Sequence, residues 1–254
     1  MDETIKILLI VCPMVFLGGF VDSVAGGGGL ISLPAYLAAG VSPHVASATN
    51  KCSAVFGTLI STLKFMKERK IHYYTAVTSA VAALLGSYIG ATLNHYLDEK
   101  YLKWVMVFVI PVIAILVMVK KDFGEANTIE QLSTQKTLVF SISIGFGIGM
   151  YDGFIGPGTG TFLILCYCTF MHFDIVTASG NAKVVNLASN LAAFVTFAVH
   201  GSIRWRIGLI AALFGIAGNY IGASLALKNG KKIIRPLFIV VLIALLVKIT
   251  YDFM

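Results

Sequence analysis

Residues 20–51 read FVDSVAGGGGLISLPAYLAAGVSPHVASATNK, and residues 150–183 read MYDGFIGPGTGTFLILCYCTFMHFDIVTASGNAK. Each stretch has an aspartate, a glycine-rich break, an apolar run and, about thirty residues after the aspartate, a lysine. Asp22 and Asp152 lie 130 positions apart, and Lys51 and Lys183 lie 132 apart. The chain therefore contains two copies of one unit, and each copy has charged residues at matching places in an apolar setting.

The composition is that of a membrane protein. Of the 254 residues, 57% are hydrophobic and 12% are charged, whereas soluble domains average about 25% charged residues. Several apolar stretches exceed the roughly 20 residues that a helix needs to cross a bilayer, and they lack the short alternating pattern of a β-barrel. The stretches are 5–24, 30–41, 44–66, 73–97, 101–119, 136–152, 160–171, 174–199, 205–227 and 233–251. We therefore predict a polytopic α-helical membrane protein.

The net charge of +7 sets orientation and does not indicate a polyanionic partner. Lys and Arg are concentrated in the loops between apolar stretches, with four at 64–70, three at 120–136 and four at 228–235. Positive charge in short loops marks the cytoplasmic side of a membrane protein. We predict that these three groups are cytoplasmic and that nucleic acid is not a partner.

The repeats predict an inverted architecture. Stretches 5–24 and 30–41 form a pair around a glycine break, as do 136–152 and 160–171, and three spanning helices follow each pair. A stretch of 12 residues makes only about 18 Å of helix, so a re-entrant hairpin fits each pair best, although two full crossings remain an alternative. Either way each half has an odd number of crossings, which inverts one repeat relative to the other.

The fold class that we expect is an all-α polytopic membrane protein with two inverted repeats. Each repeat is a glycine-broken re-entrant or short helix pair plus three transmembrane helices, giving about eight apparent transmembrane segments. The predicted parts are an N-terminal membrane repeat at 1–119, a cytoplasmic linker at 120–135 and a C-terminal membrane repeat at 136–254.

The glycine breaks are candidate parts of a binding site. Non-helical backbone at membrane depth is tolerated where protein buries it or water lines it, and a break creates a helix N-terminus whose N–H groups favour an anion. In the second copy Pro157 ends one helix, and Thr159 or Thr161 can cap the next. Close helix packing is the alternative reason for glycines in membrane helices.

Two lysines at membrane depth are the candidate charged ligands, because an ionisable group there faces a partner or a wet cavity. Our hypothesis is that they bind an anionic group together with neighbouring polar residues and the glycine breaks; an internal Asp–Lys ion pair that fixes the fold is the alternative. The candidate substrate-binding residues are Gly26, Gly27, Gly28, Gly29, Thr49, Asn50, Lys51, Gly156, Gly158, Thr159, Gly160, Asn181, Lys183, Asn186 and Asn190.

Asp22 and Asp152 are candidates for proton coupling, since carboxylates inside a membrane are natural proton relays; capping of the following N–H groups is their competing role. The cysteines and histidines have no metal-ligand spacing, so we expect neither a metal nor a cofactor. No catalytic arrangement occurs within the spans, so we do not expect an enzyme.

The residues that carry these motifs resemble the TauE/SafE family of membrane permeases, the sulfite/sulfonate exporter-like group. The resemblance rests on 19–29, on Leu-Pro-Ala at 33–35, on Ala-Thr-Asn-Lys at 48–51 and on the run 182–190. It implies transport of sulfite, sulfonates or other small organic anions across a prokaryotic cytoplasmic membrane. It also supports the breaks and the two lysines as the translocation centre.

From the residues and the resemblance we expect a secondary transporter for a small anion that works by alternating access between the repeats. An anion channel or a uniporter of the same fold for a non-sulfur organic anion is the alternative. The expected partners are the small anionic solute and the lipid bilayer, with a homodimer left open.

Overall fold

A computed structural model describes residues 3–98, 124, 127–129 and 132–241. The described residues are helical, without a strand among them, as predicted. The predicted span 101–119, half of the linker 120–135 and the end of the stretch 233–251 lie outside these residues.

The first half consists of a broken helix pair and two long helices. The pair is α1 (Glu3–Ala25) and α2 (Gly29–Ala38), and α3 (Pro43–Lys67) and α4 (Tyr73–Tyr96) follow it. Pro43 stands in the first turn of α3, where its missing N–H costs no hydrogen bond.

The second half repeats this order. Its broken pair is α6 (Thr134–Phe154) and α7 (Thr159–Phe170), and α8 (Ile175–Val199), α9 (Trp205–Asn229) and a helical segment at 231–241 follow. Asp174 caps α8 by accepting hydrogen bonds from the N–H groups of Val176 and Thr177.

Five of the described helices are long and apolar enough to cross a membrane, namely α1, α4, α6, α8 and α9. α3 is as long as α8 and α9, at 25 residues, but many of its buried side chains are polar. Such a helix is suited to the interior of a bundle because its polar groups face protein rather than lipid. α2 and α7 have only 10 and 12 residues, or about 15 and 18 Å of helix.

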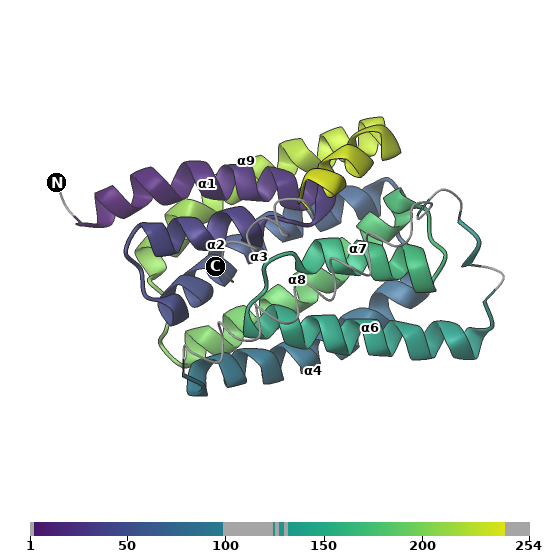
Figure 1. The fold of residues 1–254 in the computed structure, drawn as a ribbon, viewed down its shortest axis with the longest axis horizontal. Coiled ribbons are helices and arrows are strands. Elements are labelled where there is room, and N and C mark those ends of the chain that lie inside the picture. Colours follow the sequence, from purple (N-terminus) through teal and green to yellow (C-terminus); the bar gives the residue numbers. More distant parts are fainter. Residues whose placement is uncertain (1–2, 99–123, 125–126, 130–131, 242–254) are drawn as a thin grey trace, which may run out of the picture.

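The two halves are interlocked. α1 packs along α9 and α4 packs along α6, while α3 and α8 lie between these two layers and contact each other (Figure 1). The first helix of each broken pair therefore packs against a long helix of the other half.

The interlocked pairs approach closely at glycines that occupy equivalent places in the two halves. A Cβ on Gly86 would lie 2.2 Å from the carbonyl oxygen of Phe146, and a Cβ on Gly218 would lie 2.0 Å from that of Phe16. Gly86 and Gly218 are 132 positions apart, and Phe16 and Phe146 are 130 apart. Both helix pairs thus use the same small-residue packing.

The tips of the two broken pairs meet in the middle of the molecule. Thr161 Oγ1 donates a hydrogen bond to the carbonyl of Ala25 at 2.8 Å, and the N–H of Thr161 donates one to the carbonyl of Gly26 at 3.2 Å. Gly26 has a positive φ of 80°, and a Cβ there would lie 2.1 Å from the carbonyl carbon of Gly160. Only glycine fits both the backbone conformation and the contact.

Candidate functional site

Two buried ion pairs cross between the halves. Lys51 of α3 lies 2.7 Å from Asp152 of α6 (Nζ to Oδ2), and Lys183 of α8 lies 3.0 Å from Asp22 of α1 (Nζ to Oδ2). Each lysine therefore pairs with the aspartate of the opposite copy, so among the described residues these ion pairs join the two repeats. The alternative interpretation of the lysines, an internal Asp–Lys pair, is present twice in this crossed form.

The Asp152 carboxylate accepts three hydrogen bonds from side chains. In addition to Lys51, Thr159 Oγ1 donates to Oδ1 at 2.7 Å, and Ser189 Oγ donates to Oδ2 at 2.6 Å. The residue is 2% exposed. The buried carboxylate is thus paired with a cation and hydrogen-bonded, as burial of such a group requires.

Asp22 has a different environment. The side chain of Lys183 donates to its carboxylate and also to its backbone carbonyl, which in turn accepts the N–H of Gly26 at 2.8 Å. Lys183 is fully buried, whereas the Asp22 side chain keeps 13% of its surface exposed. Of the two pairs, the one at Asp22 therefore presents its carboxylate, and not its lysine, to open space.

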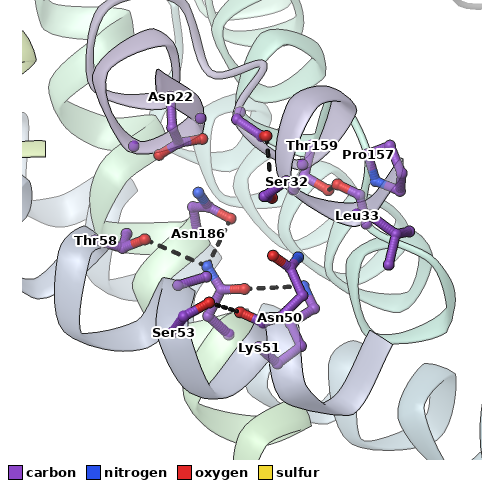
Figure 2. A pocket seen from close by; sticks show the side chains of 18 of the residues that line it. Asp22, Ser32, Leu33, Asn50, Lys51, Ser53, Thr58, Pro157, Thr159 and Asn186 are labelled. Atoms are coloured by element: carbon purple, nitrogen blue, oxygen red, sulfur yellow. Dashed lines mark hydrogen bonds between the residues drawn. The ribbon is translucent and has the colours of Figure 1, made fainter. Parts of the chain in front are cut away.

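That space is a cavity of about 50 Å³ between the two glycine breaks. In Figure 2, Asp22 faces the open centre from one side, and Lys51 and Asn50 lie on the opposite side. Thr159 and Pro157, at the second break, close the cavity on a third side. A water molecule needs roughly 10–15 Å³ of such volume, so the cavity holds a few waters or one compact anion.

An amide network fixes the lysine that lines the cavity. Lys51 Nζ donates to Asn190 Oδ1 at 2.9 Å. Asn190 Nδ2 in turn donates to Asn186 Oδ1 at 3.2 Å and lies 3.5 Å from Thr58 Oγ1 (Figure 2). Because these groups are buried and bonded to one another, the ammonium is held in position before any ligand arrives.

Twelve of the residues predicted for binding or proton coupling line this cavity. They are Asp22, Gly26, Gly28, Gly29, Asn50, Lys51, Asp152, Gly156, Thr159, Gly160, Asn186 and Asn190.

Five predicted residues do not line it. Gly27 faces Val241, and Gly158 is the left-handed residue that precedes α7. Thr49 accepts the N–H of Arg204, and Asn181 donates to the Thr177 carbonyl of its own helix. Lys183 lies behind Asp22.

The expectation that Thr159 or Thr161 caps the helix after the second break is wrong. No side chain caps α7, because the hydroxyl of Thr159 bonds Asp152 and the Gly156 carbonyl, and that of Thr161 bonds Ala25. Several first-turn N–H groups have backbone acceptors already, among them those of Leu30 and Thr161. The formal positive charge at the cavity wall is therefore that of Lys51.

Sequence reasoning missed four polar residues of the wall, namely Ser32, Ser53, Thr58 and Asn219. Ser53 and Thr58 follow Lys51 on α3. They could have been predicted by extending the polar residues before Lys51 to those that follow it along the same helix. Asn219 lies in the Gly-Asn-Tyr-Ile-Gly-Ala stretch of α9, where the surrounding glycines indicate packing. In the structure it lines the cavity and also accepts a hydrogen bond from Ser23 at 2.7 Å.

The sequence pattern that defines the Sulfite exporter TauE/SafE family matches residues 11–249 of this chain. The chain belongs to the TauE/SafE family. It is 34% identical over 252 residues to a probable membrane transporter protein of Haemophilus influenzae, covering 99% of this chain and 98% of that one. It is also 31% identical over 258 residues to the probable membrane transporter protein YfcA of Escherichia coli K12, covering 98% and 95%.

A third relative, the probable membrane transporter protein ORF9 of a Sinorhizobium species, is 33% identical over 251 residues, covering 99% and 95%. No solved structure gives a significant match to the chain. The TauE/SafE chain is thus a multi-pass membrane transporter whose relatives match it over nearly their whole length.

Proposed function

We propose that this TauE/SafE protein is a secondary transporter that carries a small anion across the cytoplasmic membrane, with a sulfur oxyanion such as sulfite or a small organosulfonate as the substrate class. The observation that carries the proposal is Lys51, a buried ammonium at the wall of a polar cavity between the two glycine breaks. The family name supplies the sulfur chemistry, and the cavity volume favours a compact ion.

Alternating access between inverted repeats is the proposed mechanism. The matching contacts of Gly86 with Phe146 and of Gly218 with Phe16 support two repeats of one design, and the odd number of predicted crossings inverts them. Binding near the midplane between two such repeats is the usual arrangement in secondary transporters. About eight transmembrane segments, with the breaks as re-entrant tips, remain the proposed topology.

Charge balance supports coupling to protons. The two aspartates and two lysines of the crossed pairs sum to zero, so a bound anion leaves one uncompensated negative charge in a low-dielectric site. Such a charge is costly, and protonation of a carboxylate removes it. Asp22 is the better candidate than Asp152, because it is more exposed to the cavity and has fewer side-chain donors.

In this mechanism a proton neutralises Asp22 as the anion enters and binds Lys51. The anion takes hydrogen bonds from Lys51 Nζ and from the hydroxyl and amide groups of the wall. Release on the other side returns the proton and restores the Lys183–Asp22 pair. The coupling is one proton for each monoanion carried.

Uptake of labelled sulfite into proteoliposomes, with and without an imposed pH gradient, tests the proposal. We expect saturable uptake that the gradient accelerates and that Lys51→Ala lowers at least tenfold. We expect Asp22→Asn to remove the acceleration. Lys136→Ala is the matched control, since Lys136 is an exposed lysine at the start of α6, away from the cavity.

Normal uptake by folded Lys51→Ala would refute the anion site. Uptake in the wild type that never saturates, and that shows no counterflow of labelled substrate against an unlabelled gradient, would favour a channel over a carrier.

A further inference from the structure

A second polar site lies away from the transport cavity, at the lysine-rich end of the molecule where α3 and α9 end and α6 begins. It is a groove of about 410 Å³ between α3 and α9, with Lys64, Lys67 and Glu68 on one wall and Tyr220, Ser224 and Lys228 on the other. Three lysines against one glutamate give it a positive balance. We propose that this groove binds the phosphate of an anionic phospholipid.

Lys64 is held in place within the groove by neutral groups. Its Nζ lies 3.3 Å from the centroid of the Tyr220 ring and donates to the hydroxyl of Ser224 and, at 3.2 Å, to the carbonyl of Tyr220. Within the described ranges, no carboxylate oxygen lies within 4.0 Å of the Nζ of any of the three lysines. The charge of the groove is thus left for an external anion.

The surface beside the groove fits an acyl chain. On α3, Leu59 and Leu63 are 41% and 51% exposed, and on α9 Leu213 and Tyr220 are 66% and 56% exposed. These residues precede the lysines along both helices, so they face the hydrocarbon when the lysines stand at the headgroup level. Basic pockets between helices on the cytoplasmic side are the usual sites for anionic headgroups. Binding of free phosphate would require the lysines but not the exposed apolar residues beside them, so these residues favour a lipid.

Lys64 is not one of the residues that recur in both repeats. Tyr220 has its equivalent in Tyr88 of the first half, 132 positions earlier, but the position 132 after Lys64 is Thr196. The aromatic ring is thus common to both repeats, whereas the lysine occurs at this place in only one of them. Anionic lipid headgroups are a feature of the cytoplasmic leaflet, where the lysine-rich end is predicted to lie.

The test is native mass spectrometry of the purified protein with phosphatidylglycerol and, as a neutral lipid, phosphatidylcholine. We expect the wild type to retain phosphatidylglycerol preferentially. The double variant Lys67→Gln/Lys228→Gln should bind it about 25-fold more weakly, because each lysine near a headgroup contributes about fivefold. Both side chains are exposed, so the fold is unaffected. The matched control is Lys70→Gln/Lys136→Gln, which removes two exposed lysines at the same end but outside the groove.

Three results would overturn the proposal. The first is unchanged phosphatidylglycerol binding by the groove variant, and the second is an equal loss in the control. The third is thermal stabilisation of the wild type by millimolar inorganic phosphate that the groove variant abolishes, without any preference for the anionic lipid. That last result would identify a site for free phosphate.

Discussion

Four charged residues decide the chemistry of the transport site, and they act as two crossed pairs. Lys51 and Asp152 are buried and hold further hydrogen bonds, whereas Asp22 faces the cavity in front of Lys183. The same two residue types at matching places in the repeat thus have different roles in the two copies. One pair offers its ammonium to the cavity and the other its carboxylate.

At this scale we predict that stability and transport can be separated at Lys51. Lys51→Met leaves Asp152 buried without its counter-ion and should cost about 3–5 kcal/mol, whereas Lys51→Met/Asp152→Leu should recover most of this loss. The hydroxyls that bond Asp152 have second acceptors, the Gly156 carbonyl for Thr159 and the Asn186 carbonyl for Ser189. Thermal unfolding in detergent measures the change in stability, and sulfite uptake measures the change in transport.

Neither variant should transport the anion, because both lack the ammonium. Transport by the double variant would mean that Lys51 serves only to neutralise Asp152. A double variant no more stable than Lys51→Met would mean that the pair contributes little to the fold.

Among the helices, close backbone approach decides which elements pair. Gly90 of α4 packs against Met150 of α6, and Gly222 of α9 packs against Phe20 of α1; an added Cβ would lie 2.1 and 2.4 Å from the respective carbonyl oxygens. Gly90 and Gly222 are again 132 positions apart. Without these glycines the two helices of each pair, α4 with α6 and α1 with α9, would have to separate.

We predict that Gly90→Ala destabilises the protein by about 1–3 kcal/mol, as overpacking of a well-packed core does. The control is Gly147→Ala on α6, where a Cβ meets nothing within 4 Å. There the better helix propensity of alanine should leave stability equal or raise it by up to about 1 kcal/mol. The midpoint of thermal unfolding in detergent checks both, and equal effects at the two positions would refute the packing explanation.

Much of this element-scale structure could be predicted from the sequence, and its limits have physical causes. The glycine breaks are local patterns, so they can be identified from the sequence. The partner of Gly86 cannot, because a small residue records that something is close but not which helix it is. For the same reason the aspartates and lysines do not reveal that they pair across the halves.

The site shows the same division. The residues beside each break line the cavity because they are adjacent in sequence to the motif. Asn219 stands among packing glycines, and its sequence neighbours give no sign that it faces the cavity. Lys183 matches Lys51 in the sequence, but its position behind Asp22 depends on how the two halves are arranged in space.

At the level of the whole molecule, the described helix ends other than those at the two glycine breaks gather at two opposite ends (Figure 1). The loops after α3, α7 and α9 and the start of α6 lie at one end, which carries most of the described lysines. The loops after α2, α4 and α8 and the start of α1 lie at the other. The loop at 64–70, the start of α6 and the end of α9 thus lie at one end, and the side of the membrane that this end faces stays a prediction from the positive loops.

We predict that the two ends are exposed on opposite sides of the membrane. In a variant without the four native cysteines, Lys136→Cys should react with a membrane-impermeant maleimide only from the cytoplasmic side, and Asp98→Cys only from the outer side. Both positions are exposed. Labelling of intact cells and of inverted vesicles distinguishes the sides, and labelling of both positions from one side would contradict the orientation.

The crossed pairs also bear on how the protein is made. A ribosome delivers the first half to the membrane before the second, so Asp22 and Lys51 reach the bilayer while Asp152 and Lys183 are still unsynthesised. Each unpaired charge at the centre of a membrane helix costs about 2.5–3.5 kcal/mol on the insertion scale. The first half therefore inserts with two unpaired charges, and these must be kept away from lipid until the second half is made. Lys183 is the last of the four charged residues to be translated, so α1 can reach its final position only after Lys183 is available to pair with Asp22.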